Sequence, residues 1–232
     1  MSPDEINFCF SVKKLENSLV KLVPFVRSIH LQLYLDGARH HPDLHRFLPY
    51  GPFSDLAQLQ DTLEDRVFRD PCSSLFAIID KTRSQDEEIE CDAPSFAGSI
   101  GFLRASPENS SIEIGHILIL PSFQHTHVGV NAIGLLLAYC LERPNEGGLG
   151  LRRVQWQAHA ANVRSIGLAQ KMGFKLEGYI RWQRVLKPGK EGDERTDGRG
   201  PGRSSAMLSI CWDDWEQDGV KEAVLKAIDL RN

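Results

Sequence analysis

Two neighbouring segments that are apolar on nearly every side set the strongest limit on what this chain can fold into. Ile112–Leu120 is almost entirely β-branched or leucine, which is typical of a strand covered on both faces. Ile133–Arg143 contains the run GLLLAYCL, which predicts a buried helix. Both segments require a substantial core, and 232 residues with 41% hydrophobic content can supply one as a single domain.

The segments that follow alternate between strand and helix. Arg153–Ala158 has apolar residues on one face and polar residues on the other, which predicts a strand. Asn162 stands at the position of a helix cap, Gly173 lies just past the end of that short helix, and Phe174–Leu186 is extended in character. The helix residues predicted to point inward are Val163, Ile166, Ala169 and Met172.

The N-terminal part of the chain predicts two strand pairs and two helices. In chain order these are a strand or hairpin over residues 11–25 that Pro24 stops, a helix over Val26–Asp36, a helix over Asp55–Phe68 capped by Ser54 or Asp55, and paired strands at Leu75–Asp80 and Phe96–Leu103 around the acidic stretch Ser84–Asp92.

The C-terminal part begins with Lys187–Arg203, which has no large apolar residue, and we expect it to be a mobile loop. Ser205–Trp212 predicts a last strand. Asp213 or Asp214 would cap a final helix whose apolar residues are Trp215, Val220, Val224 and Ile228. No linker or repeat divides the chain, so residues 1–232 are expected to form one mixed α/β (α+β) domain.

The charge balance argues against a general nucleic-acid binder. The chain has 27 Lys and Arg against 31 Asp and Glu, a net charge of −4, whereas phosphate-backbone binding requires a basic excess. No apolar run approaches the ~20 residues that cross a bilayer, and the acidic start does not resemble a signal peptide. We therefore expect a soluble cytoplasmic protein without a membrane partner. Five scattered cysteines without a CxxC pair favour reduced thiols and no structural zinc.

The turn Gln124–Val130 connects the apolar strand to the apolar helix and has the form of an anion site. A turn that leads consecutive backbone N–H groups into a helix N-terminus can bind phosphate, because those amides lack partners and the helix dipole favours negative charge. Gly129 would permit a special backbone shape or the close approach of a ligand. Alone this signal is weak, since a glycine before a helix often has a purely structural reason.

Several motifs resemble those of the GNAT superfamily of acyl-CoA-dependent N-acyltransferases, especially the branch of ribosomal-protein N-terminal acetyltransferases. They are EIGHILILP at Glu113–Pro121, QHTHVGVNA at Gln124–Ala132, RRVQWQAHAANVRS at Arg152–Ser165 and AQKMGFKLEG at Ala169–Gly178. LVKLVPF, LPYGPF and AMLSICWDDW also look like this branch, so the resemblance covers most of the chain.

The resemblance implies a central twisted mixed sheet, flanked by helices, with two neighbouring strands splayed apart and acyl-CoA in the V-shaped opening. Asn162 would hydrogen-bond the pantetheine arm and Ser165 would face the thioester sulfur. Residues three apart on a helix share a face, so both can reach one ligand. The pyrophosphate would rest on the backbone amides of His125, Thr126, His127, Val128, Gly129 and Val130.

One departure from the family pattern lies in this turn. His125 and His127 occupy positions where glycines or an arginine are common, and only Gly129 keeps the small character. A blocked approach would weaken donor binding, whereas protonated imidazoles would help to hold a polyanion.

Acyl transfer to an amine needs a base, an oxyanion donor and a proton for the thiolate. Glu113 is the first base, acting directly or through water, and its alternative role is a surface carboxylate. His116 and His159 are weaker choices, since each is more often structural or exposed. Ser165 would donate to the thiolate or merely cap its helix. The oxyanion donor would be a backbone N–H near Ile117 or Leu118, where this fold commonly carries a bulge.

For several other residues a structural role explains the sequence as well as a functional role or better. Tyr50 and Phe53 would line the acceptor pocket, although aromatic packing of a proline-rich turn explains them equally well. Arg164 and Lys171 would meet the 3′-phosphate of CoA or remain solvated. The cluster of His40, His41 and His45 is a poor metal site because Pro42 interrupts it, and no metal is expected. Cys140, Trp156 and Trp212 are expected to pack in the core.

The sequence therefore predicts an N-acetyltransferase that uses acetyl-CoA as acyl donor, with direct attack by a primary amine. The absence of a Cys/His nucleophile pair favours the direct route. The acceptor would be a small-molecule amine or a peptide N-terminus, and the protein a monomer or homodimer. The alternatives are a CoA-binding or sensing protein of the same fold without turnover, and an interaction module with an empty cleft.

Overall fold

The computed structural model describes residues 7–83, 93–195 and 198–229, so the predicted acidic loop at Ser84–Asp92 lies outside the described residues. One eight-stranded sheet runs through the described chain in the order β1-β2-β3-β4-β5-β6-β8-β7. Its strands are β1 (Leu15–Glu16), β2 (Val20–Pro24), β3 (Ser74–Asp80), β4 (Phe96–Ser106), β5 (Ser111–Ile119), β6 (Arg153–His159), β7 (Lys175–Val185) and β8 (Gly202–Cys211). Neighbouring strands are antiparallel except β5 and β6, which are parallel.

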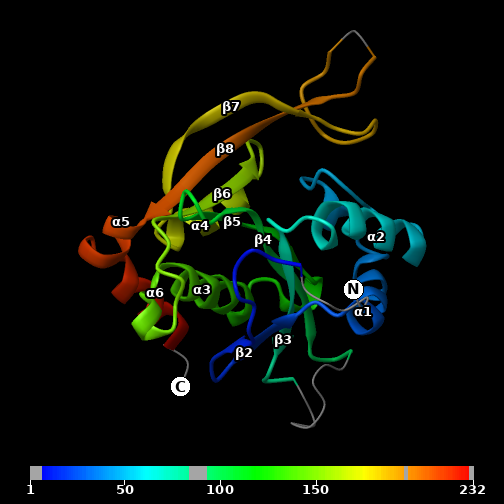
Figure 1. Cartoon of the computed structure of the whole chain (residues 1–232). Coiled ribbons are helices and arrows are strands. Elements are labelled where there is room, and N and C mark those ends of the chain that lie inside the picture. The colour runs from blue at the N-terminus through cyan, green and yellow to red at the C-terminus, as the bar shows by residue number, and fades with distance from the viewer. Residues whose placement is uncertain (1–6, 84–92, 196–197, 230–232) are drawn as a thin grey trace.

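Helices cover both sides of the sheet (Figure 1). They are α1 (Arg27–Ala38), α2 (Leu56–Leu63) with its continuation η2 (Glu64–Phe68), α3 (His127–Leu141), α4 (Val163–Lys171), α5 (Trp212–Gln217) and α6 (Val220–Asp229). Short 3-10 turns are η1 (Pro42–His45), η3 (Pro121–Phe123) and η4 (Pro144–Glu146). Helix α3 packs on β1, β2, β3, β5, β6 and α6, while α1 packs on α2 and β4. This is the mixed, helix-flanked sheet that the sequence predicts. Among the described helices none has the length and apolarity to span a membrane.

The apolar helix begins earlier than its sequence predicts. Thr126 is the N-cap and α3 starts at His127, six residues before the predicted start at Ile133. The residues in between include a glycine, polar residues and two β-branched valines, so they lack the continuous apolar character of the helix that follows. The structure makes them helical through the Thr126 cap and through Asn131, which is 2% exposed and bonds both the His127 carbonyl and Asn17.

The predicted final helix is two helices. Helix α5 ends before Gly219, where the backbone φ of +75° breaks the run, and α6 follows. The N-cap is Cys211 and not Asp213 or Asp214, but the Asp214 carboxylate accepts the Cys211 N–H at 2.8 Å. Trp215 is buried, as predicted.

Two single-residue predictions about burial are wrong. Trp212 is 43% exposed and lies at the start of α5, and Val163 is 73% exposed in the first turn of α4. Both sit beside a helix start, where the helical phase is set by the cap and periodicity is a poor guide. The other inward residues of α4, Ile166, Ala169 and Met172, are buried as predicted.

The segment between β7 and β8 reaches back across the molecule toward the loop before α2 (Figure 1). Lys190 Nζ donates to the carbonyls of His45 and Tyr50 at 2.7 and 3.0 Å, and Glu191 forms an ion pair with Arg46. These contacts fasten one point of the segment. That Lys187–Arg203 as a whole is mobile remains a prediction.

Candidate active site

The parallel strands β5 and β6 separate towards their carboxyl ends. They are paired from Ser111 and Arg153 only as far as Ile114 and Trp156, although β5 continues to Ile119. Beyond that point β5 still pairs with β4, and β6 still pairs with β8. Along the described chain no strand fills the gap, so the facing backbone groups of β5 and β6 remain for a ligand or water. The predicted splay is thus present.

A bulge lies on β5 just where the separation begins. Gly101 pairs with Gly115 and Ser99 with Leu118, so three residue steps on β5 oppose two on β4. His116 takes up the extra residue with a positive φ of 51°, and Ser99 Oγ donates to its carbonyl at 3.2 Å. A bulge turns backbone groups out of the ladder, which is what an oxyanion donor near Ile117 or Leu118 requires.

The N-terminus of α3 has the form of the predicted phosphate cradle. Thr126 Oγ accepts the Val128 N–H at 3.3 Å and donates to the Phe123 carbonyl at 2.7 Å. Regular helix geometry uses the Val130 N–H in the first intrahelical bond, so His127 and Gly129 offer the amides with no helical partner. A Cβ placed on Gly129 would meet nothing within 4 Å, so the approach to these amides is open.

The two histidines of this turn lie differently from each other. His125 is exposed, and it carries the positive φ of 61° that the turn needs. His127 Nε2 lies 3.2 Å from Oδ1 of the buried Asp80 at the end of β3. The His127 ring therefore has a partner in the sheet, and Gly129 remains uncovered.

Arg83 is a cation beside this cradle that sequence reasoning missed. Its Nη2 donates to the Ser122 carbonyl at 2.8 Å, and its guanidinium lies 4.1 Å from the centre of the Phe123 ring. The side chain is 40% exposed. The only sequence signal was its place just after β3, and the pairing of β3 with β4 is what brings it near the turn after β5.

The start of α4 faces the point at which β5 and β6 separate. Asn162 is the N-cap, as predicted, and its Oδ1 accepts the Ser165 N–H at 3.1 Å. Ser165 Oγ accepts the indole N–H of Trp156 at 3.1 Å. Trp156 is the last β6 residue paired with β5, so Ser165 is held at the apex of the opening. Its own hydroxyl hydrogen stays available to donate, and so does the Asn162 amide group.

Glu113 is buried, not a surface carboxylate. It is 4% exposed and accepts Arg104 Nη1 at 2.5 Å. Burial raises the pKa of this carboxyl above its ordinary value, and the positive charges of Arg104, Arg184 and Arg203 oppose that rise. A raised pKa makes a carboxylate a stronger proton acceptor, so the chemistry of Glu113 fits a base as well as an ion-pair partner.

Tyr50 and Phe53 lie in a buried aromatic cluster next to the bulge. They are 4% and 8% exposed, with ring centres 6.2 Å apart. The Tyr50 hydroxyl lies 2.8 Å from His116 Nδ1, while His116 Nε2 is buried without a hydrogen-bond partner in the described chain. Burial and the nearby Arg66 and Arg184 lower the pKa of His116 to about 4. His116 is thus a neutral imidazole at neutral pH.

The remaining predicted residues are distributed as follows. His159 is 7% exposed, and its ring bonds the Ala161 amide at 3.1 Å, which favours a structural role. His45 is 1% exposed and lies 3.2 Å from the Tyr34 hydroxyl, whereas His40 and His41 are exposed; the three do not bring ligand atoms together in the described chain.

Cys140 is fully buried, and burial raises the pKa of its thiol. Arg164 and Lys171 are exposed.

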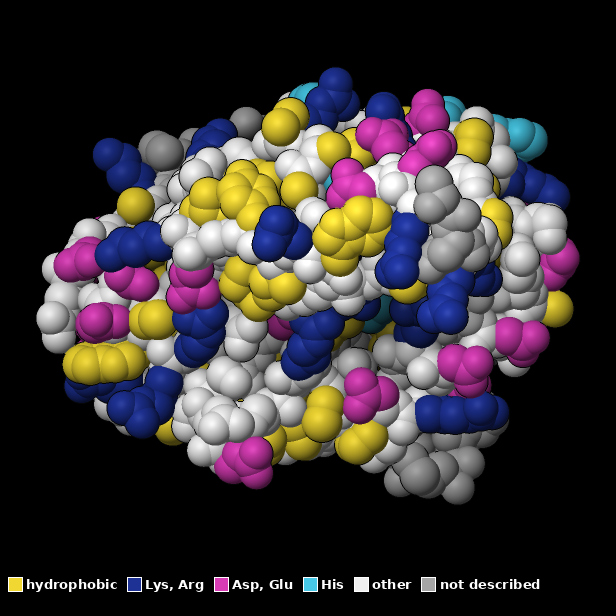
Figure 2. Space-filling model, turned by 90° about the horizontal axis from the view of Figure 1, so that it is seen from above, with side chains coloured by type: hydrophobic (Ala, Val, Ile, Leu, Met, Phe, Trp, Pro, Cys, Tyr) yellow, Lys and Arg dark blue, Asp and Glu magenta, His cyan; other side chains and the backbone are white. Residues whose placement is uncertain are grey.

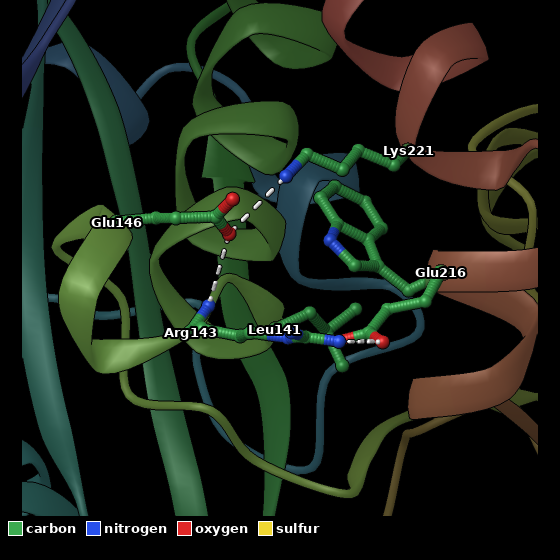
Figure 3. Close-up of a pocket in the computed structure, with 6 residues that line it drawn as sticks. Leu141, Arg143, Glu146, Glu216 and Lys221 are labelled. Carbon is green, nitrogen blue, oxygen red and sulfur yellow. Dashed lines mark hydrogen bonds and ion pairs between the residues drawn. The ribbon is translucent and has the colours of Figure 1, made fainter.

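A pocket of about 200 Å³ lies away from this site, between the end of α3 and the helices α5 and α6 (Figure 3). Its charged side chains satisfy one another, because Arg143 pairs with Glu216 and Lys221 pairs with Glu146. These ion pairs connect the end of α3 and the turn after it to α5 and α6. We assign the pocket no role in the chemistry.

Comparison with known proteins agrees with this architecture. A family model described as an acetyltransferase (GNAT) domain matches residues 20–175. A GCN5-related N-acetyltransferase from Brucella melitensis is similar at 25% identity and a TM-score of 0.73, over 92% of this chain and 84% of that one. No curated protein matches the chain.

Two more distant solved structures share the fold. A spermidine N-acetyltransferase from Vibrio cholerae, in complex with CoA and spermine, is 15% identical with a TM-score of 0.61, over 86% of this chain and 99% of that one. RimL, a ribosomal alpha-N-protein acetyltransferase in complex with coenzyme A, is 16% identical with a TM-score of 0.64, over 87% and 99%. The family match spans well over half of the sequence and includes the separated strands, the bulge and the start of α3, so the chain belongs to the GNAT acetyltransferase family.

Proposed function

We propose that this protein is an N-acetyltransferase that moves an acetyl group from acetyl-CoA to a primary amine by direct attack. The observation that carries the proposal is the opening between β5 and β6, which has the uncovered N-terminus of α3 beyond its β5 end and Ser165 at its apex. An opening of this kind presents unpaired backbone groups to an amide-rich arm and a positive helix end to phosphate.

The donor site follows from these elements. The amides of His127 and Gly129 hold the pyrophosphate, with His125, Thr126, Val128 and Val130 shaping the turn and Arg83 supplying a nearby cation. Asn162 keeps its Oδ1 for the helix cap and uses its amide group toward a pantetheine carbonyl. The residues present fit CoA, because the surface above Gly129 is open.

The reaction exchanges one bond to the acetyl carbon for another. The amine nitrogen attacks the thioester carbonyl, a backbone N–H at the bulge near Ile117 or Leu118 stabilises the oxyanion, and the C–S bond then breaks. Ser165 donates a hydrogen bond or a proton to the sulfur, whose thiol pKa of ~8.5 requires little assistance. The amine proton leaves to a base.

Two residues, His116 and Glu113, are candidates for the base, and they differ in position and in pKa. His116 lies at the bulge itself, but with a pKa lowered to about 4 it is a weak proton acceptor. Glu113 has a raised pKa, yet it lies three residues before His116, about 10 Å along the strand. We propose Glu113 as the base acting through water, with Tyr50 and Phe53 as the wall of the acceptor pocket.

The acceptor is proposed as a small-molecule amine or a peptide N-terminus. The peptide choice is supported by the resemblance of the motifs to the ribosomal-protein N-terminal branch. The Vibrio cholerae enzyme is named for spermidine and RimL for a ribosomal protein, so acceptors differ widely among proteins of this fold.

The experiment is free-thiol release from acetyl-CoA with a panel of primary amines, together with mass spectrometry of the product and of the denatured protein. The proposal predicts an acetylated amine and no covalent acetyl-protein. An acetyl-protein intermediate would contradict direct attack. Tight CoA binding with no thiol release from any amine would instead support the sensing protein.

A further inference from the structure

Four arginines surround Glu113 and His116, and the proposed chemistry uses none of them. They are Arg66 in η2, Arg104 in β4, Arg184 in β7 and Arg203 in β8. The charges of the last three act on Glu113, and those of Arg66 and Arg184 act on His116. Arg184 and Arg203 are also register partners on neighbouring strands. Seen from the side of β7 and β8, Lys and Arg side chains border a hollow in the surface (Figure 2).

This arginine cluster holds more positive than negative charge. Within the described residues, only Arg104 has a carboxylate partner in the cluster, and that partner is Glu113. Four guanidinium groups therefore face one carboxylate, in a chain whose net charge is −4. Glu113 cannot neutralise the cluster alone.

Two of the arginines have a buried Nε without a hydrogen-bond partner among the described residues. Arg203 as a whole is 6% exposed, whereas Arg184 is half-buried. Burial and the neighbouring arginines lower the pKa of Arg203 to about 10, so its guanidinium still carries its charge at neutral pH. A buried, charged and unpaired donor is costly to a folded protein. Such donors indicate a ligand that supplies the missing acceptors.

We infer that the acceptor is an amine that carries carboxylate groups, which the cluster of Arg66, Arg104, Arg184 and Arg203 binds next to the acetyl-transfer site. This inference rests on the proposed N-acetyltransferase function and narrows its substrate class. An edge of guanidinium formed by Nε and one terminal nitrogen offers two parallel donors, which match the two oxygens of a carboxylate.

The same charges disfavour a polyamine acceptor. A chain of ammonium groups would meet a net positive wall, and like-charge contacts exclude wrong partners. The likeness to the spermidine enzyme therefore extends to the fold and not to the acceptor.

The test uses three tripeptides with a free N-terminal alanine and an amidated C-terminus, so that only side chains can supply a carboxylate. They differ in the last two residues: Ala-Glu-Glu, Ala-Gln-Gln and Ala-Lys-Lys. Thiol release at saturating acetyl-CoA gives kcat/KM for each, and free glutamate and spermidine are run beside them. We expect kcat/KM for Ala-Glu-Glu to exceed that for Ala-Gln-Gln by about tenfold or more, and to fall as salt rises. Turnover of free glutamate would identify an amino acid as the source of the carboxylate, and turnover of the tripeptide alone a peptide.

The variants Arg184→Gln and Arg203→Gln should lose most of this preference through KM, so the ratio of kcat/KM for Ala-Glu-Glu to kcat/KM for Ala-Gln-Gln should fall toward one. Because Arg203 is buried and its loss could disturb folding, Arg66→Gln provides a second test at an exposed position. Arg181→Gln is the matched control, since Arg181 lies on the same strand and acts on neither Glu113 nor His116.

Titration calorimetry of Ala-Glu-Glu with the protein alone separates this inference from the proposed function. Arginine-dependent binding without thiol release from any amine would support the carboxylate site and reject the acetyltransferase. Turnover with equal kcat/KM for the three tripeptides, or with preference for Ala-Lys-Lys, would overturn the carboxylate site and leave the acetyltransferase standing. Neither binding nor turnover would reject both.

Discussion

At the scale of single residues, Asn162 and Ser165 each have a structural role and a proposed role in the reaction. Asn162 caps α4 with its Oδ1, and the same side chain is proposed to donate to pantetheine. Ser165 takes the Trp156 indole N–H and is proposed to donate its own hydroxyl hydrogen to the sulfur. Substitutions must therefore separate binding or turnover from stability.

The two tasks of Asn162 can be separated by an aspartate. Asn162→Asp keeps an oxygen for the cap, so the free energy of unfolding should stay within about 0.5 kcal/mol of the wild type. It removes the amide donor, so the Kd for acetyl-CoA should rise by about tenfold. Urea unfolding and titration calorimetry measure the two effects. An unchanged Kd would remove Asn162 from the donor site.

Ser165→Ala tests the proposed role of the Ser165 hydroxyl at the apex of the opening between β5 and β6. The loss of the hydroxyl leaves the Trp156 indole N–H without its acceptor, so stability should fall by about 1 kcal/mol. Turnover should fall by about tenfold while donor Kd changes little, because the sulfur is the group affected. A raised donor Kd with unchanged kcat would mean that Ser165 serves binding instead.

Glu113→Gln tests the base through the pH profile. A base works only when deprotonated, so the raised pKa of Glu113 places the acid limb of wild-type kcat/KM above the ordinary glutamate range. The variant should lose that limb and be slowed most at the lower pH values where wild-type Glu113 is still deprotonated, since the free amine is scarce there. An unchanged profile would show that Glu113 serves only as the partner of Arg104.

At the scale of elements, the start of α3 matters most for the donor. Thr126→Val removes the hydroxyl that binds the Val128 N–H and the Phe123 carbonyl, which should cost about 1 kcal/mol in the free energy of unfolding. Thr126→Ser keeps the hydroxyl, so its free energy of unfolding should equal that of the wild type. Thr62→Val, inside α2, is the control for a threonine that caps no helix. Equal stability of all four proteins would mean that the cap contributes nothing.

A comparison of the predicted with the observed elements shows which parts of the fold can be predicted from the sequence. Cap residues, proline stops and apolar periodicity predicted nearly every strand and helix, and family motifs predicted the splayed strands. The roles of Asn162 and Ser165 toward acetyl-CoA stay predictions. Periodicity failed at element ends, because the Thr126 cap starts α3 six residues before the apolar run and Gly219 divides the last helix. Arg83 and the arginine cluster were not predictable, since their neighbours come from strands and helices far away in the sequence.

At the scale of the whole molecule, the β7–β8 segment joins the two sides of the proposed acceptor site. Lys190→Met would break its bonds to the carbonyls of His45 and Tyr50, and we expect acceptor KM to rise severalfold while donor Kd is unchanged. Lys187→Met, at an exposed position, is the control. Hydrogen exchange of residues 186–195 should quicken only in the first variant; equal exchange in both would show that Lys190 does not fasten the segment.

A donor site at the start of α3 is tested by titration calorimetry of acetyl-CoA with the wild type and with Gly129→Leu and Gly167→Leu. Both glycines lie in helices with open space around them, so neither substitution should unfold the protein. We expect micromolar binding to the wild type and to Gly167→Leu, and none to Gly129→Leu, whose side chain would cover the amides of α3. Equal binding by all three, or no binding by the wild type, would contradict a donor site at this helix.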